Sequence, residues 1–192
     1  MASFASKRLA KELSKLNNDT HKLPPGIELV STETFEEWLV DIRVLDDNPL
    51  YKGEMYRLKF RFSASYPIEP PEVVFCKTAD RPIPIHPHIY SNGIICLDLL
   101  GQQGWSPVQN VESVCMSIQS MLTGNSKNER PPGDEEFVRA SRALSVVEAE
   151  SSGTRDGRRS EILMPEYTLA FPTFALRSVL LRVIVWRTPG NW

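Results

Sequence analysis

The 192-residue sequence contains only three cysteines, and their number and spacing exclude a disulfide framework. Cys76, Cys96 and Cys115 form neither an even set nor a close group. Proteins that keep their thiols free belong to reducing compartments. We therefore expect a cytoplasmic and/or nuclear location.

The sequence also lacks a leader, a membrane-spanning run and a strong net charge. Residues 1–15 have no continuous apolar core of the kind found in signal peptides. The apolar stretch at residues 169–186 is interrupted by Pro172, Arg177 and Arg182, so no run of about 20 apolar residues remains to cross a bilayer. The net charge of −2 gives no bulk attraction to nucleic acid. Neither a membrane nor nucleic acid is expected as a partner.

What the sequence does contain is a set of periodic apolar segments that predict an α+β domain. Two segments have helical spacing, two alternate as half-buried strands do, and one is a short apolar strand. In chain order they are a helix around Leu9, Leu13 and Leu16, strands at residues 38–44, 56–62 and 73–76, and a helix at residues 110–123. Cys76 and Cys115 lie in apolar periodic segments and are expected to be inert core thiols. Asp134, followed by Glu135 and Glu136, is a predicted helix N-cap.

The last quarter of the chain differs from the rest. We divide the sequence into a main domain at residues 1–140 and a divergent extension at residues 141–192. Residues 151–159 resemble a flexible linker, and the apolar residues after Leu169 have strand propensity without clear helix caps. One hypothesis is that this extension arises from an unspliced or shifted reading frame.

The segment from His86 to Cys96 has the features of a nucleophile site. Its sequence, His-Pro-His-Ile-Tyr-Ser-Asn-Gly-Ile-Ile-Cys, places one cysteine after an Asn-Gly turn and downstream of two histidines. A cysteine thiolate is both a good nucleophile and a good leaving group. A zinc site would need a fourth ligand beside His86, His88 and Cys96, and His21 is the only other histidine, so we expect no metal.

This segment resembles the active-site loop of the ubiquitin-conjugating enzymes, in which His-Pro-Asn precedes the thioester cysteine. His88 stands where that pattern has Asn. The His-Pro-His form followed by Tyr-Ser-Asn-Gly resembles the W-type branch of the family, which modifies protein N-termini. Supporting matches extend from Arg8 to about Arg139 and include Tyr66-Pro67-Ile68-Glu69-Pro70-Pro71, Trp105-Ser106-Pro107 and Arg130-Pro131-Pro132.

The resemblance implies a fold, a reaction and a set of partners. The fold would be an N-terminal helix, a four-stranded antiparallel meander, an active-site loop, a central helix and a shortened C-terminal helical part. The enzyme would take ubiquitin from the ubiquitin-activating enzyme and pass it, with RING or U-box ligases, to protein substrates with free N-termini. No cofactor would be bound, because ATP is used upstream by the activating enzyme. Lysine-directed transfer, a related modifier, or a non-catalytic ubiquitin-binding variant remain alternatives.

The resemblance also implies roles for individual residues. Cys96 would carry the thioester, and His86 would support the loop structurally. His88 would support the loop or the oxyanion, or accept a proton from the incoming amine. Glu129 is a candidate for assisting the acceptor amine.

The implied docking residues lie in the first helix, two loops and the central helix. Lys7, Arg8 and Lys11 would meet the activating enzyme; Arg8, Ile68, Ser106, Pro107 and Val108 would meet the ligase; and Met116 and Ser120 would contact the donor ubiquitin. Trp105 is expected to anchor its loop instead of touching a partner. The Tyr66–Pro67 bond is a candidate for a cis peptide.

Overall fold

The computed structural model describes residues 3–17 and 23–153, with side chains placed as far as residue 143. Residues 1–141 form one compact unit, and residues 142–192 form a second. The elements are helix α1 (Phe4–Leu16), strands β1 (Ile27–Ser31), β2 (Glu37–Ile42), β3 (Tyr56–Arg61) and β4 (Glu72–Cys76), the short 3-10 helix η1 (Asp98–Leu100), and helices α2 (Val111–Thr123) and α3 (Asp134–Gly153).

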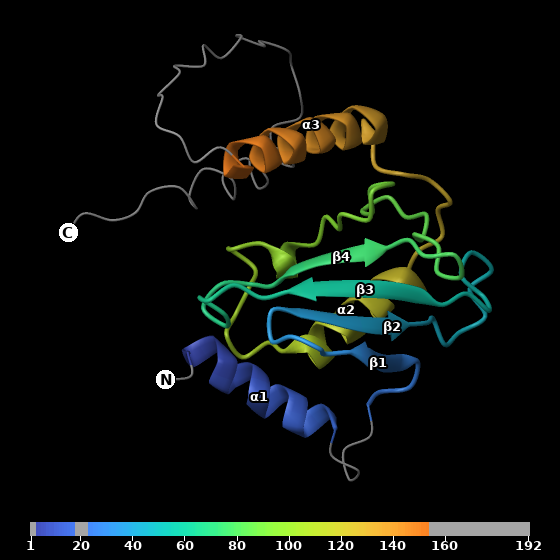
Figure 1. The fold of residues 1–192 in the computed structure, drawn as a ribbon. Coiled ribbons are helices and arrows are strands. Elements are labelled where there is room, and N and C mark those ends of the chain that lie inside the picture. Colours follow the sequence, from blue (N-terminus) through green and yellow to red (C-terminus); the bar gives the residue numbers. More distant parts are fainter. Residues whose placement is uncertain (1–2, 18–22, 154–192) are drawn as a thin grey trace. The chain divides into compact units, whose positions relative to one another are not determined.

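The four strands form an antiparallel meander, which confirms the predicted fold class. Their order in the sheet is β1-β2-β3-β4, so each strand pairs with its neighbour in the chain (Figure 1). In register, Trp38 lies opposite Phe60, and Leu58 lies opposite Phe75. These side chains are almost completely buried, and they show that the alternating apolar residues all face the core. The sequence had located three of the strands and missed β1.

Helix α2 covers the inner face of the sheet and lies behind it in Figure 1. Its stripe of Val114, Cys115, Ile118 and Leu122 is completely buried, as the helical periodicity predicted. A capping box fixes its start: the Asn110 side chain accepts from the Ser113 amide at 2.9 Å, and the Ser113 hydroxyl accepts from the Asn110 amide at 3.0 Å.

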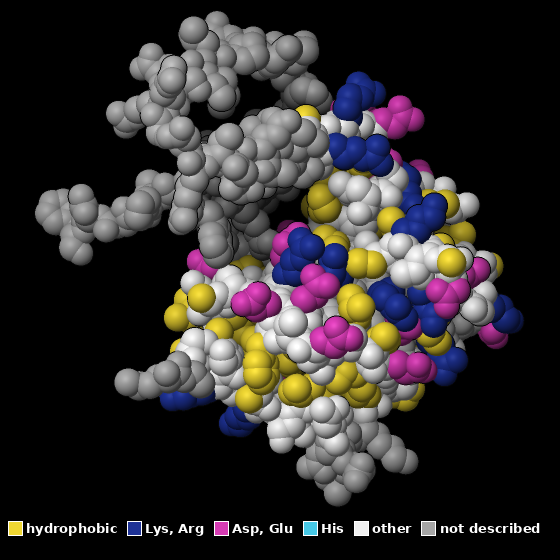
Figure 2. Space-filling model, viewed as in Figure 1, with side chains coloured by type: hydrophobic (Ala, Val, Ile, Leu, Met, Phe, Trp, Pro, Cys, Tyr) yellow, Lys and Arg dark blue, Asp and Glu magenta, His cyan; other side chains and the backbone are white. Residues whose placement is uncertain are grey.

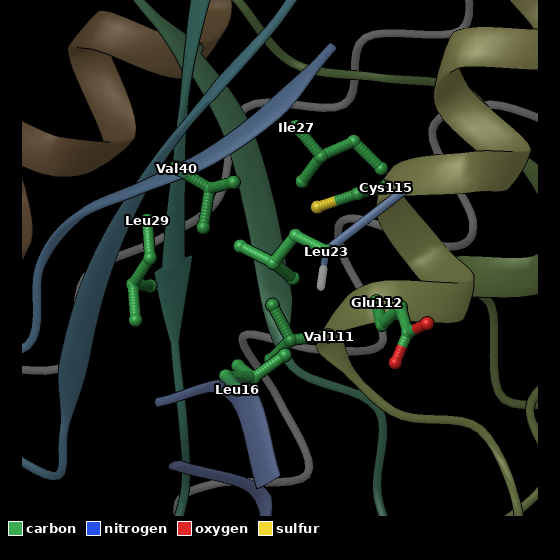
Figure 3. Close-up of a pocket in the computed structure, with 8 residues that line it drawn as sticks. All are labelled: Leu16, Leu23, Ile27, Leu29, Val40, Val111, Glu112 and Cys115. Carbon is green, nitrogen blue, oxygen red and sulfur yellow. The ribbon is translucent and has the colours of Figure 1, made fainter. Parts of the chain in front are cut away.

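Helix α1 packs its apolar side against the same core. Leu9 is buried, and Leu13 and Leu16 are partly buried. A small cavity remains between the end of α1, β1, β2 and α2, lined mostly by apolar side chains, with Glu112 at its edge (Figure 3). Glu112 is paired with Lys15 at 3.0 Å, so the one charged side chain of this lining already has a partner.

The outer face of the sheet carries side chains of both charges (Figure 2). It also includes one buried carboxylate, that of Asp41. Asp41 is only 3% exposed, although the alternating pattern had placed it on the solvent side. Arg57 donates to both of its oxygens at 2.8 and 3.0 Å, and Arg81 donates at 3.0 Å. Burial alone would raise the pKa of Asp41, but these hydrogen bonds and charges outweigh it, so the pKa lies below its usual value.

Cys76 corrects one of the sequence expectations. Its neighbours Val73 and Phe75 point into the core, whereas Cys76 is half-buried on the outer face opposite Arg57. The apolar run of β4 hid this alternation, since Val74 on the outer face is apolar as well. Cys115, in contrast, is the inert core thiol that was predicted.

Helix α3 also differs from expectation at both ends. Asp134 is the first residue of the helix, and its carboxylate accepts from the Ser91 amide at 2.7 Å instead of capping its own helix. The helix continues to Gly153, so residues 151–153 are helical where a linker was predicted. The remainder of that linker and the apolar stretch at residues 169–192 lie outside the described residues. No helix in the described part of the chain is long and apolar enough to span a bilayer.

Asp41 provides a test of this sheet. A carboxylate with a lowered pKa in the folded state stabilises the protein above the unfolded-state pKa of about 3.9, and that stability is lost as the pH falls through the folded pKa. We expect Asp41→Asn to cost about 2–3 kcal/mol at pH 7, less than the ~3–5 kcal/mol for fully buried pairs because both guanidiniums reach solvent. Urea unfolding at pH 7 and at pH 3 measures both effects.

The matched control is Glu37→Gln. Glu37 lies on the same face and pairs with Arg61 at 3.2 Å, but its side chain is 42% exposed. Its substitution should cost less than about 1 kcal/mol. Equal losses in the two variants, or an Asp41→Asn protein that loses as much stability between pH 7 and pH 3 as the wild type, would contradict the buried ion-pair assignment.

Candidate active site

The segment between β4 and η1 is irregular, and a tight turn pins it to the sheet. The Gly93 amide donates to the Tyr90 carbonyl at 2.9 Å, and the Phe75 amide of β4 donates to the Gly93 carbonyl at 2.9 Å. Gly93 has φ of +92°, and a Cβ there would lie 2.0 Å from the Phe75 carbonyl oxygen. Only glycine therefore fits this turn. The Asn-Gly pair places Cys96 three residues beyond a fixed point on the sheet.

His86 is a structural part of this loop. It is 4% exposed, and its Nδ1 accepts from the His88 amide at 2.9 Å. Burial, and then the nearby charge of His88, lower the pKa of His86, and a hydrogen bond with the Met121 backbone offsets this only in part. A neutral imidazole bonded on both sides fits the predicted role of loop support.

His88 and Cys96 are joined directly through the backbone. The Cys96 amide donates to the His88 carbonyl at 2.8 Å. The His88 side chain is exposed, and its ring centre lies 5.5 Å from that of His86. Within the described residues its imidazole forms no hydrogen bond, so it is available to an incoming group.

Cys96 is exposed, and its surroundings keep the thiol protonated. Partial burial of the sulfur, and then the negative charge of Asp98, raise the pKa of Cys96. Among the described residues, no lysine or arginine contributes an opposing charge effect. The sulfur is therefore placed to exchange an acyl group without a strong base at its side, an arrangement that disfavours hydrolysis of an acyl intermediate.

Residues distant in sequence brace this loop from behind. Arg130 donates to the carbonyls of Ile83, Pro84 and Ile89. Tyr51 donates to the Ile85 carbonyl at 2.8 Å. The sequence had included Arg130 in a family motif without a structural role, and it gave no signal for Tyr51.

The first turn of α3 packs against the same loop. Tyr90 is stacked on Phe137 with ring centres 3.8 Å apart, next to the bond between Ser91 and Asp134. Burial, and then the charges of Cys96 and Asp134, raise the pKa of Tyr90. Tyr90 and Ser91 therefore connect the loop that holds Cys96 to α3.

Glu129 lies apart from the loop contacts. It is exposed and pairs with Lys127 at 3.6 Å. Within the described residues it contacts neither Cys96 nor His88. Likewise, the described part of the chain contains no group of three or more His, Cys, Asp or Glu residues that could hold a metal, and His21 lies outside it.

The two predicted docking loops are exposed at their tips and joined at their bases. Ile68 and Val108 are 72% and 79% exposed. Trp105 is buried, and its indole N–H donates to the Pro67 carbonyl at 2.7 Å, so Trp105 anchors its loop as predicted. The Tyr66–Pro67 bond is cis. Pro107 is exposed and Ser106 half-buried.

A buried carboxylate on α1 joins the docking loops to the start of helix α2. Glu12 accepts from the Tyr66 hydroxyl at 2.7 Å, from Arg8 at 2.6 Å and from the Val111 amide at the start of α2 at 3.2 Å. Arg8 also donates to the Gln109 carbonyl at 2.9 Å, so this guanidinium has an internal role. The sequence did not single out Glu12, because its partners are far away along the chain.

The remaining predicted contact residues lie on helix surfaces. Lys7 and Lys11 of α1 are exposed. Met116 and Ser120 of α2 are also exposed, with Met116 at 48%. All four are therefore accessible to partner proteins.

Comparison with known proteins identifies the family. The model of the family described as "Ubiquitin-conjugating enzyme" matches residues 8–145. A Danio rerio protein named "Probable ubiquitin-conjugating enzyme E2 W-A" is 44% identical over 142 residues, which cover 72% of this chain and 88% of that protein. "Ubiquitin-conjugating enzyme E2 W" of Caenorhabditis elegans is 39% identical over 142 residues, covering 72% and 88%.

A solved structure gives the same result. The ubiquitin conjugating enzyme E2 UbcA1 from Agrocybe aegerita matches with a TM-score of 0.67 and 45% identity, covering 72% of this chain and 95% of that one. The family match includes the loop with His86, His88 and Cys96. The chain belongs to the ubiquitin-conjugating enzyme family and is similar to its W-type members.

Proposed function

We propose that Cys96 carries ubiquitin as a thioester and that the preferred acceptor is the α-amine of a protein N-terminus. The observation that supports this most strongly is the position of Cys96, exposed and backbone-bonded to His88 in a braced loop. We assign the catalytic unit to residues 1–140, since the family match ends at residue 145 and the first compact unit ends at residue 141. Residues 141–192 are then an extension of that unit.

In the charging step, Cys96 attacks the thioester carbonyl that links ubiquitin to the activating enzyme. A new sulfur–carbon bond forms at Cys96, and the bond to the activating enzyme's sulfur breaks. The proton of the Cys96 thiol passes to the departing thiolate. Because the two sulfurs are chemically alike, this exchange needs no strong base and no bound cofactor. ATP is consumed only upstream.

In the transfer step, a neutral amine attacks the thioester carbonyl. The carbonyl oxygen becomes negative, the carbon–sulfur bond breaks with the thiolate leaving, and the nitrogen loses a proton. A neutral His88 has one N–H with which to stabilise the oxyanion, and its other ring nitrogen accepts a proton. We propose that exposed His88 supplies one of these functions.

The acceptor preference has an acid–base component. With pKa values of about 7.8 for an α-amine and about 10.4 for lysine, about a quarter of the α-amine but only about a thousandth of the lysine is neutral near pH 7.4. An acceptor that is already partly neutral needs little help from the enzyme. The charge of Asp98 acts on Cys96, and a carboxylate there would attract either amine in its cationic form, so lysine-directed transfer stays an alternative.

We assign the docking surfaces from exposure. Lys7 and Lys11 would meet the activating enzyme, and Met116 and Ser120 the donor ubiquitin. The exposed tips at Ile68, Pro107 and Val108, with Ser106 beside them, would bind a RING or U-box ligase, because a few exposed apolar anchors can dominate an interface. Arg8 would support this surface from beneath. Glu129 remains a candidate for assisting the acceptor amine from its exposed position.

The first prediction concerns charging. With ubiquitin, activating enzyme and ATP, the wild type should form a ubiquitin adduct that a reducing agent removes. Cys96→Ser should form instead a stable oxygen ester or no adduct, because an alkoxide leaves far less readily than a thiolate. Non-reducing gel electrophoresis measures this. The control is Cys76→Ser on the outer sheet face, which should charge normally. A reducible adduct that persists in Cys96→Ser would rule out Cys96 as the carrier.

The second prediction concerns the acceptor. Charged enzyme should lose ubiquitin faster to a peptide with a free N-terminus than to the same peptide acetylated there and bearing one lysine. Rapid discharge to the lysine peptide with no reaction at the free N-terminus would establish the lysine-directed alternative. His88→Asn and His88→Ala extend the test: if the N–H donor matters, only the Ala variant should be slow, and if proton acceptance matters, both should be slow.

The third prediction concerns the ligase surface. Ile68→Ala and Val108→Ala should each reduce ligase-stimulated discharge by about tenfold, as expected for loss of an interface anchor worth about 1–2 kcal/mol. Charging by the activating enzyme should not change. Val30→Ala is the control, because Val30 is 43% exposed on β1, a different element. A loss in the Val30 variant equal to that in the loop variants would argue against a ligase site at these loops.

A further inference from the structure

The guanidinium of Arg130 holds the backbone on both sides of the His-Pro-His segment. Nη1 donates to the Pro84 carbonyl at 2.6 Å and to the Ile89 carbonyl at 3.1 Å, and Nη2 donates to the Ile83 carbonyl at 3.2 Å. These carbonyls precede and follow His86-Pro87-His88. They lie 46, 41 and 47 residues from Arg130 in the sequence. One side chain therefore closes a loop that has no regular secondary structure.

These hydrogen bonds are strong ones. Burial lowers the pKa of Arg130, and the charges of Asp134 and Tyr51 oppose that effect. An arginine nevertheless stays protonated in proteins, so each contact is charge-assisted and stronger than a bond between neutral groups. Without the Arg130 guanidinium, the carbonyls of Ile83, Pro84 and Ile89 would each lose a hydrogen-bond donor.

The contact to Ile89 leads directly to the nucleophile. Ile89 follows His88, whose carbonyl accepts from the Cys96 amide, and it forms a bridge with Ile95, the residue before Cys96. A shift of Ile89 would therefore move His88 and Cys96 relative to each other. Misplacement of reacting groups by about 1 Å can cost about a hundredfold in rate.

We propose that Arg130 is a positioning residue for transfer of the acyl group to the amine, and that it sets the geometry between His88 and Cys96 by holding the carbonyls of Pro84 and Ile89. This inference rests on the proposed role of Cys96, but it does not depend on which amine is the acceptor. Lysine cannot replace arginine here. The lysine side chain is shorter and ends in one ammonium nitrogen, whereas the planar guanidinium of arginine donates to carbonyls on two sides.

The test separates the two half-reactions of the full-length chain. Arg130→Lys, Arg130→Gly and wild type are charged, the activating enzyme is stopped, and the thioester is followed after addition of an N-terminal peptide. We expect charging within about twofold of wild type, because it needs only an accessible sulfur. We expect discharge to slow by about tenfold or more, with the loss in kcat and not in the KM for the peptide.

Arg57→Lys is the matched control. Arg57 also uses its guanidinium on buried acceptors, but on the outer face of the sheet at Asp41. Each variant is assayed at the same temperature interval below its own Tm, so that lost stability alone does not mimic the effect. Discharge by Arg57→Lys should match wild type. In Arg130→Gly, millimolar guanidinium should restore part of the discharge rate, and ammonium should not.

The outcomes distinguish this inference from the proposed function. A wild type that never charges on Cys96 overturns both. Normal charging with wild-type discharge in Arg130→Lys overturns the inference alone, as does an equal slowing in Arg57→Lys. If Arg130→Lys does not fold, the guanidinium rescue of Arg130→Gly decides, and if neither variant folds, Arg130→Gln, which keeps an amide donor, takes their place with the same criteria.

Discussion

An irregular loop must have its backbone polar groups satisfied by other parts of the protein, and this constraint shapes the active site. The chain from Ile83 to Cys96 contains no helix and no named strand. Its carbonyls and amides are paired with Arg130, Tyr51, the β4 backbone and one another. The location of Cys96 is therefore a property of the whole catalytic unit, and its neighbours in sequence contribute only a part of it.

The chemistry of the site depends more on where the Cys96 sulfur lies than on a lowered pKa of its thiol. Burial, and then the charge of Asp98, raise the pKa of Cys96, and burial lowers the pKa of His86, so both shifts favour the neutral forms of these two side chains. A hydrolase would need a base beside its nucleophile. A carrier of a thioester benefits from the opposite arrangement, in which the acyl group persists until an amine arrives. The exposed His88 imidazole, which forms no hydrogen bond within the described residues, is the group that we propose responds to that amine.

The regular elements could be predicted from the sequence because their signals are local. The apolar periods of β2, β3 and α2 depend on neighbouring residues, and they place Trp38, Phe60 and Ile118 in the core correctly. The loop motif also carried its own signal, and so did the anchoring role of Trp105. Several of the failures share one cause, which is that they depend on pairing across the fold. Asp41 is buried only because Arg57 and Arg81 meet it.

The same cause explains the supports of the site that the sequence left unassigned. In the sequence, Arg130 and Glu12 look like ordinary charged residues. Their roles appear only in the folded chain, where Arg130 reaches loop carbonyls and Glu12 accepts from a hydroxyl and a helix amide. Asp134 was predicted to cap its own helix, but in the folded chain its carboxylate accepts from the Ser91 amide. Cys76 was misplaced because a run of apolar residues conceals which of them face outward.

The loop's rigidity can be measured directly by amide hydrogen exchange on the uncharged, full-length enzyme. The amides of Phe75, His88 and Cys96 each donate one bond of the bracing network, to Gly93, to the His86 ring and to the His88 carbonyl. If the loop is held before any partner binds, all three should exchange nearly as slowly as the amides of β3. Exchange of His88 and Cys96 at the rate of an unstructured peptide, with β3 fully protected, would show that the site is not preformed and would contradict this view of the enzyme.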